Sequence, residues 1–219
     1  MSRSRQQLAV QRPATARIVL LPGAKERGDG FARAGFHDAI RERGLAIDLE
    51  YCELEFDHVT DRSMLDRLRS GPIATARADG YEVVWLAGVS LGAFMALGFA
   101  EQYPTDLNGV CLIAPYLGTR IITREIGLAG GVAGWAPGEV AAEDEDRRIW
   151  RFIKSRRGTQ PALYLGYGRD DRFADSQQLL AVSLPPESVD VVNGAHDWPA
   201  WRQIWNHFLD KWPTLGCPA

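Results

Sequence analysis

Short apolar runs alternate with longer amphipathic stretches along most of the chain. The short runs are rich in β-branched and aromatic residues, which is typical of strands buried on both faces. They span residues 17–21, 45–54, 81–87, 109–114, 162–167 and 189–192. Helical patterning follows them, at about residues 31–43, 61–78, 93–103, 140–156, from 176 onward and 198–212. Strands that alternate with helices predict an α/β domain, in which helices cover both faces of a mainly parallel sheet of about six strands in a three-layer α/β/α arrangement.

Glycine and proline mark the expected ends and breaks of these elements. Gly44 ends the first helix, and Gly71-Pro72 interrupts the second, because proline lacks the N–H that a helix interior uses. Residues 1–15 are polar and carry arginines, which predicts a loose N-terminal tail with residues 8–10 as a candidate edge strand. Residues 16–213 form one predicted domain, since 219 residues suit a single hydrophobic core.

The third apolar run leads into the sequence Gly88-Val89-Ser90-Leu91-Gly92. This G-x-S-x-G pattern is weak by itself, but here an apolar strand precedes it and an apolar helix, which ends at Pro104, follows it. A sharp strand-to-helix turn exposes the serine hydroxyl and places it near a helix N-terminus. The two glycines allow a strained backbone to pack closely against its neighbours. The pattern in this context predicts Ser90 as a nucleophile.

A serine nucleophile needs a base, and the chain has four histidines. His37 and His207 lie in helical patterning, which favours packed or solvated side chains, and His58 in a predicted loop is a weaker candidate. His196 follows the last predicted strand and a short turn, from which its ring is able to reach over the sheet edge toward Ser90. We therefore predict His196 as the base, the alternative being a solvent-bonded residue at a helix start.

One of two neighbouring aspartates is expected to orient the base. Asp170 and Asp171 both follow the fifth predicted strand. Asp171 is favoured because it stands three residues past Gly168, the spacing at which a tight turn returns its fourth residue toward the sheet. The other aspartate then caps the turn or pairs with a neighbouring arginine. Asp175 and Asp197 are predicted caps of the helices that begin next to them.

The order Ser90, Asp171, His196, each after a predicted strand, resembles the α/β-hydrolase superfamily, whose triad follows that order. The resemblance extends from about residue 17 to residue 212. It implies the α/β-hydrolase fold, with His196 taking the proton from Ser90 and Asp171 holding the imidazole tautomer. It also implies chemistry that needs no cofactor and no metal.

Two shorter segments carry the same resemblance. Residues 18–24 are similar to the strand and loop that hold the second oxyanion donor, with Pro-Gly where the family usually has His-Gly. The resemblance implies an oxyanion hole formed by the backbone N–H groups of Leu91 and Ala24, with Lys25 as the alternative to Ala24. Residues 194–201 are similar to the Gly-Gly-His-x-Trp-x-x-Trp ending of esterase D-like and mycolyltransferase-like members, a likeness that assigns no substrate.

The segment 116–158 is longer than a minimal crossover between two strands. It has a glycine-rich part, 127–138, and then the charged helix, and it lies where the family often inserts a lid. An ordinary long crossover that contains one helix is an equally weighted alternative. If the segment is a lid, Tyr116, Leu117 and Trp135 are candidates for the substrate pocket.

Tryptophans recur at roughly helical spacing after residue 197. Trp201, Trp205 and Trp212 are expected to face the core, because such a stripe is more often buried than part of a binding cage. Trp198 is expected to help shape the substrate pocket, since it stands two residues after His196.

Composition narrows the classes of partner and compartment. Hydrophobic residues make up 46% of the chain and charged residues 24%, with a formal net charge of −3, which gives no reason to expect a nucleic acid or a membrane surface as partner. The cysteines have no metal-ligand spacing; Cys52 and Cys111 are expected as buried reduced thiols, and Cys217 lies in the tail. No apolar run reaches transmembrane length and the N-terminal arginines precede no apolar stretch of signal-peptide length, so we expect a cytoplasmic protein.

These features predict a serine hydrolase that cleaves a small-molecule carboxylic ester, or a thioester, through an acyl-enzyme on Ser90. Two other interpretations stay open: an acyltransferase that uses the same three residues, and a non-catalytic binding protein that keeps the fold. Product analysis with competing nucleophiles separates the first alternative. The complete set of three residues argues against the second, since a binding module has no use for all of them.

Overall fold

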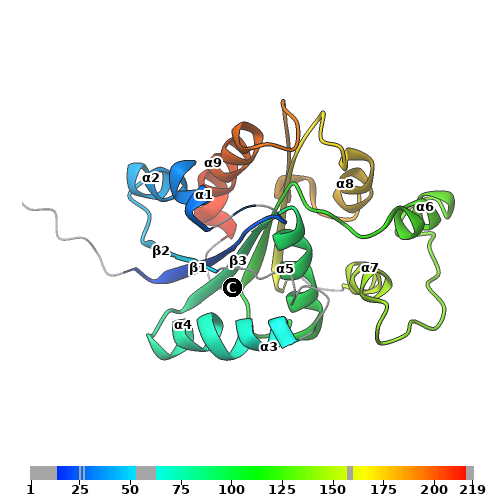
Figure 1. Cartoon of the computed structure of the whole chain (residues 1–219), viewed down its shortest axis with the longest axis horizontal. Coiled ribbons are helices and arrows are strands. Elements are labelled where there is room, and N and C mark those ends of the chain that lie inside the picture. Colours follow the sequence, from blue (N-terminus) through cyan, green and yellow to red (C-terminus); the bar gives the residue numbers. More distant parts are fainter. Residues whose placement is uncertain (1–13, 25, 27, 53–62, 157–159, 216–219) are drawn as a thin grey trace, which may run out of the picture.

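Six parallel strands form one sheet at the centre of the described part of the chain (Figure 1). The computed structural model describes residues 14–24, 26, 28–52, 63–156 and 160–215. The strand order across the sheet is β2-β1-β3-β4-β5-β6, and every neighbouring pair is parallel, which confirms the predicted sheet. The strands are β1 (Ala16–Leu21), β2 (Ile47–Tyr51), β3 (Val83–Val89), β4 (Gly109–Ile113), β5 (Ala162–Gly168) and β6 (Val189–Val192).

Alternating residues of β3 explain why helices cover both faces of the sheet. Val84 and Leu86 belong to the hydrophobic core on one face, whereas Trp85 and Ala87 belong to the core on the other. Helices α1, α2 and α9 pack on the Trp85 face, and α3 to α8 contribute to the opposite core (Figure 1). The helices are α1 (Gly28–Arg33), α2 (Phe36–Glu42), α3 (Ser63–Leu68), α4 (Ala74–Ala78), α5 (Leu91–Gln102), α6 (Arg120–Leu128), α7 (Glu145–Ser155), α8 (Ala174–Ala181) and α9 (Trp198–Leu215).

The prediction of one continuous helix over 31–43 is wrong. The structure has two helices, α1 and α2, and the second begins after Gly35, whose φ of 78° lies in the left-handed region that glycine tolerates. The predicted strand 45–54 is also shorter, since β2 ends at Tyr51 and residues 53–54 lie outside the described chain.

The predicted interruption at Gly71-Pro72 is confirmed. A π-helical turn, Arg69–Ile73, joins α3 to α4, and Gly71 inside it has a φ of −96° and a ψ of −105°. Pro72 has no N–H to donate at this point, so the regular helical hydrogen bonding stops and then resumes.

The segment that begins at residue 116 contains two helices, so the expectation of a single helix there is wrong. The missed helix, α6, buries Ile122 and Ile126 against the core. The charged helix, α7, begins at Glu145 rather than at residue 140, because the Asp144 Oδ1 accepts a hydrogen bond from Arg147 N at 3.0 Å and caps the first turn.

Two predicted helix caps have different outcomes. Asp197 caps α9 as predicted, because its Oδ1 accepts a hydrogen bond from Ala200 N at 3.2 Å. The prediction for Asp175 is wrong, since α8 already begins at Ala174 and Asp175 lies within its first turn. A carboxylate there still interacts favourably with the positive end of the helix dipole.

Some predictions concern residues outside the described chain, namely Lys25, His58, Cys217, the candidate strand 8–10 and the tail up to residue 13. Cys111 is fully buried in β4, as predicted, whereas Cys52 is only partly buried. Within the described ranges, no helix has the length and apolar character needed to cross a membrane.

Candidate active site

The sharp turn between β3 and α5 holds Ser90 in a conformation that serine rarely adopts. Its φ is 54° and its ψ is −113°, and the residue is 7% exposed. The backbone around it is fixed on both sides: Ser90 N donates to Ile113 O at 3.0 Å, and Ser90 O accepts from Tyr116 N at 3.1 Å. Because strain of this kind persists only where the surroundings enforce it, the turn is a site feature rather than a loose loop.

The two glycines of the G-x-S-x-G sequence are required by close packing. A Cβ at Gly88 would lie 2.3 Å from the backbone carbonyl of Gly92, and a Cβ at Gly92 would lie 2.2 Å from Leu21 O. Any larger residue at either position would have to displace backbone, so the turn is pressed directly against the end of β1.

The structure brings Ser90, His196 and Asp171 into one hydrogen-bonded line. The His196 Nε2 lies 3.0 Å from Ser90 Oγ, and the His196 Nδ1 lies 2.8 Å from Asp171 Oδ2. The Asp171 side chain is fully buried and that of His196 is 10% exposed. In this arrangement a neutral imidazole with its proton on Nδ1 donates to the carboxylate and has its Nε2 lone pair facing the serine hydroxyl.

Asp171 is held by its own turn at the end of β5. Its N–H donates to Gly168 O at 3.1 Å, and its Oδ1 accepts from Phe173 N at 2.8 Å. Asp170 is exposed and its N–H donates to Gly194 O at 3.0 Å, which ties the turn to the loop that carries His196. Of the two aspartates that the sequence left as alternatives, Asp171 is therefore the one that lies against the imidazole.

The other described histidines have other surroundings. His37 is exposed on α2, and the His207 Nδ1 lies 3.7 Å from Asp190 Oδ1.

Two aromatic rings contact the imidazole of His196. The ring centroid of Phe173 lies 5.2 Å from that of His196 at an interplanar angle of 85°, and the centroid of Trp201 lies 5.3 Å away at 87°. Sequence reasoning missed Phe173 in this role, although it stands two residues after Asp171. Trp201 is 4% exposed, as expected for the core-facing stripe, and it also borders the site. The two rings limit rotation of the imidazole and reduce its contact with water.

Tyr116 lies next to this aromatic group. Its ring contacts Phe94 at 5.4 Å and Phe173 at 5.6 Å between centroids, and the side chain is half-buried. Burial, and then the nearby charge of Asp146, raises the pKa of the Tyr116 hydroxyl above its ordinary value of 10.0. Tyr116 therefore borders the site as a neutral, largely apolar side chain.

The two residues predicted to form an oxyanion hole flank the turn. Leu91 is the first residue of α5, so its N–H has no partner within the helix. Ala24 is exposed and follows Gly23, where a Cβ would lie 3.5 Å from Ser90 Cβ. The loop after β1 thus runs directly beside Ser90.

Trp198 links this loop to α9. Its Nε1 donates to Glu26 Oε2 at 3.2 Å, and its ring is packed so tightly on Gly30 that a Cβ there would lie 2.6 Å from Trp198 Cζ2. Phe31 contacts the same ring at 5.5 Å between centroids. Sequence reasoning missed Glu26, because a pair 172 residues apart leaves no local signal.

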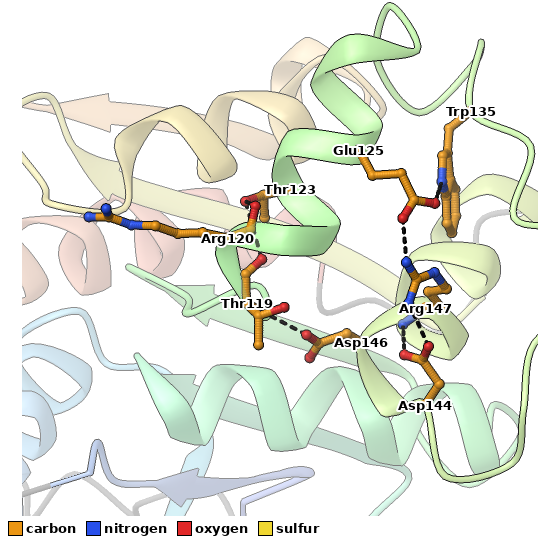
Figure 2. Close-up of polar contacts among 8 residues, drawn as sticks. All are labelled: Thr119, Arg120, Thr123, Glu125, Trp135, Asp144, Asp146 and Arg147. Carbon is orange, nitrogen blue, oxygen red and sulfur yellow. Dashed lines mark hydrogen bonds and ion pairs between the residues drawn. The ribbon is translucent and has the colours of Figure 1, made fainter.

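Polar contacts hold α6 against α7 (Figure 2). Arg147 forms ion pairs with Glu125 on α6 and with Asp144 at 2.7 Å, and Trp135 Nε1 donates to the same Glu125 at 2.8 Å. Trp135 is 2% exposed. Its indole is part of the core under α6, so it does not line an open pocket in this conformation.

Leu117, another pocket candidate, is also in the core. It is 1% exposed, and its carbonyl oxygen accepts a hydrogen bond from Trp150 Nε1 at 2.9 Å. Among the described residues, no group of three or more His, Cys, Asp and Glu side chains has an arrangement that could hold a metal ion.

Comparison with known proteins gives similarities at low sequence identity. No family model matches the sequence. An acetyl esterase from Caldicellulosiruptor saccharolyticus is 24% identical over 180 residues, which cover 74% of this chain and 65% of that protein. The chain therefore spans slightly less than two thirds of the length of this curated relative.

Solved structures are similar over most of the chain. An S-formylglutathione hydrolase, FrmB, from Staphylococcus aureus has a TM-score of 0.59 at 12% identity, over 91% of this chain and 81% of its own. FphF, a fluorophosphonate-binding serine hydrolase of the same organism, has a TM-score of 0.61 at 13% identity, over 91% of this chain and 83% of its own. A monoacylglycerol lipase from Paleococcus ferrophilus has a TM-score of 0.56 at 14% identity, over 91% of this chain and 94% of its own. At these identities the likeness demonstrates a shared fold.

Proposed function

Because the chain has the α/β-hydrolase fold, we propose that it is a serine hydrolase that cleaves a carboxylic ester through an acyl-enzyme on Ser90. The proposal rests on two short contacts. The Ser90 Oγ lies 3.0 Å from His196 Nε2, and the His196 Nδ1 lies 2.8 Å from Asp171 Oδ2. Fold alone does not determine function, whereas this arrangement of nucleophile, base and carboxylate is suited to acyl transfer.

The reaction begins when Ser90 Oγ attacks the ester carbonyl while His196 Nε2 takes the hydroxyl proton. Asp171 stabilises the imidazolium that forms, and its fixed turn maintains the orientation of the ring. The negative charge on the carbonyl oxygen is stabilised by the N–H groups of Leu91 and Ala24.

Collapse of the tetrahedral intermediate breaks the bond to the alcohol, which leaves with the proton from His196. The imidazole then takes a proton from water, and the resulting hydroxide attacks the acyl-enzyme. The second collapse releases the carboxylic acid and returns the proton to Ser90. Residues of the chain and water account for every atom, so the cycle needs no cofactor.

The substrate class rests on the aromatic surroundings and on the relatives. Phe173 and Tyr116 present apolar surface next to the His196 imidazole, and Trp198 packs on the loop that runs beside Ser90, which favours a small acyl or alcohol group over an extended polar chain. The similar proteins named above include an acetyl esterase and a lipase. A thioester is an alternative substrate for the same chemistry, because its carbonyl reacts with the same nucleophile.

The test is mass spectrometry of the intact protein after treatment with a fluorophosphonate, a reagent that phosphonylates activated serines. We expect one adduct, mapped to Ser90, together with hydrolysis of short 4-nitrophenyl esters; both are lost in Ser90→Ala. Ser183→Ala, which changes an exposed serine bonded to Leu179 O, is the matched control and keeps both activities. Absence of any adduct on folded protein would contradict the proposal, and transfer of the acyl group to added alcohol in preference to water would identify an acyltransferase.

A further inference from the structure

An acidic side chain lies beside Ser90 on the loop that follows β1. A Cβ at Gly23 would be 3.5 Å from Ser90 Cβ and 3.6 Å from Glu26 Cγ, so the two side chains flank the same point. With ordinary bond lengths, the Glu26 carboxylate is within about 10 Å of Ser90 Oγ. A charge at this distance acts on any charged substrate that reaches the serine.

The Glu26 carboxylate is held in place. Its Oε2 accepts the hydrogen bond from Trp198 Nε1, and its own N–H donates to Gly23 O at 3.0 Å. The Trp198 ring is wedged against Gly30 and contacts Trp201 at 5.0 Å between centroids. Since Trp201 also contacts His196, the carboxylate is anchored to the same aromatic group that surrounds the base.

Within the part of the chain that the structure describes, the other charges around the site do not cancel this one. Asp171 is already paired with His196. On the opposite side of the turn, Asp146 acts on Tyr116 and accepts a hydrogen bond from Thr119 N at 2.8 Å (Figure 2). Among the described residues near the site, the cation is Arg172, whose guanidinium carbon lies 4.9 Å from the ring centroid of Phe173; it is exposed, so solvent screens it more than the half-buried Glu26.

We propose that Glu26 sets the charge preference of the site, so that it accepts neutral and positively charged esters and disfavours esters with a carboxylate in the acyl or alcohol part. The inference rests on the proposed esterase function. Two unit charges about 10 Å apart, at an effective dielectric constant of about 20, change a rate constant on the order of tenfold before salt screening.

The experiment compares three 4-nitrophenyl esters of equal chain length, with acyl groups that end in a methyl, a trimethylammonium or a carboxylate group. For the wild type at low salt, we expect kcat/KM to be highest for the cationic ester and lowest for the anionic one. In Glu26→Gln the ratio of cationic to anionic kcat/KM should fall by at least about tenfold, because the cationic ester loses an attraction and the anionic ester loses a repulsion. The neutral ester should change by less than about twofold. Glutamine keeps an oxygen that accepts from Trp198, so the loop stays anchored. Glu26→Asn serves as the second charge-removing variant if Glu26→Gln fails to fold.

The control is Glu82→Gln, which removes an exposed carboxylate just before β3. Glu82 lies at the N-terminal end of this strand, whereas Ser90 follows its C-terminal end, so the substitution should leave the ratio of cationic to anionic kcat/KM unchanged. An unchanged ratio in Glu26→Gln, or a wild type that prefers the anionic ester, would overturn the inference. A uniform loss on all three esters would also overturn it, because Glu26 would then position the loop without selecting charge. Failure of the wild type to hydrolyse the neutral ester, with no label on Ser90, would instead refute the proposed function.

Discussion

Gly92 lies so close to Leu21 that a methyl group on its Cα would sit 2.2 Å from the Leu21 carbonyl oxygen. This contact joins the first turn of α5 to the end of β1. The strand end leads into Pro22 and Gly23, which run beside Ser90. The turn that carries the candidate nucleophile and the loop that carries a candidate oxyanion donor are thus one packed unit.

Gly92→Ala should therefore both destabilise the fold and impair the site. The new methyl group must displace backbone of β1, and overpacking of this kind costs about 1 to 3 kcal/mol in free energy of unfolding. Denaturant unfolding measures this cost, and the rate of fluorophosphonate labelling measures the loss at Ser90.

Gly127→Ala is the matched control. This glycine lies in the exposed part of α6 with nothing within 4 Å of its Cβ position, so alanine should be neutral or stabilise by up to about 1 kcal/mol. Equal effects of the two substitutions would contradict the packing argument.

Asp171→Asn should lower kcat by on the order of 10³ to 10⁴, with a small change in KM. The amide would present N–H groups to His196 Nδ1 and favour the wrong tautomer, while the hydrogen bond from Phe173 N is kept. Steady-state kinetics on a neutral ester measures the loss. Asp170→Asn is the control and should keep kcat. If Asp170→Asn lowered kcat by that factor while Asp171→Asn stayed active, the triad carboxylate would be Asp170.

The ion pair between Glu125 of α6 and Arg147 of α7 should stabilise the fold at neutral pH and less in acid. Hydrogen bonds from Trp135 and Arg147 lower the pKa of Glu125 from its ordinary value of 4.5. In the unfolded chain, the Glu125 carboxyl group has its ordinary pKa. The stabilisation is therefore complete above about pH 4.5 and is lost as the pH falls through the lower pKa that Glu125 has in the folded state.

Arg147→Gln measures that contribution. These side chains are partly exposed, between 29% and 37%, so we expect a loss of about 1 kcal/mol near pH 7. The difference from the wild type should shrink below pH 4, as urea unfolding over a pH series will reveal. A difference that stays constant down to pH 3 would mean that Arg147 acts through packing.

The buried pair Arg148–Glu101 should behave differently. It joins α7 to α5 with side chains only 7% and 16% exposed, and the arginine also donates to Ala142 O at 3.1 Å. Arg148→Met leaves a buried carboxylate without its partner and should cost about 3 to 5 kcal/mol. The double variant with Glu101→Met should recover most of that loss; additive losses would indicate that the two residues do not stabilise each other.

The sequence predicted those features that depend on neighbours along the chain. The apolar run before Gly88 and the apolar run after Gly92 required a strand and a helix joined by a sharp turn. The ends of parallel strands meet at one edge of a sheet, so the residues after three predicted strands were expected together, and Ser90, Asp171 and His196 are in contact. Their catalytic roles stay predictions until the variants are measured.

Features that depend on distant contacts escaped the sequence. Helix α6 is stabilised by the burial of Ile122 and Ile126, two residues beside a glycine-rich stretch that carries no helix signal of its own. The hydrogen bond from Trp198 to Glu26 and the contact of Phe173 with His196 arise only when separate strands align their ends. Packing decides all of these, and local propensity does not.

The parallel arrangement of the strands also determines when the site forms during folding. Ser90 and His196 are 106 residues apart in the chain. Two parallel strands pair only after the crossover between them has closed, which costs chain entropy. We expect helical structure and early collapse to precede this alignment, because the hydrogen bond between the two side chains depends on β6 joining β5. During refolding, the reactivity of the serine should therefore be a late signal, one that reports a complete sheet rather than the helices around it.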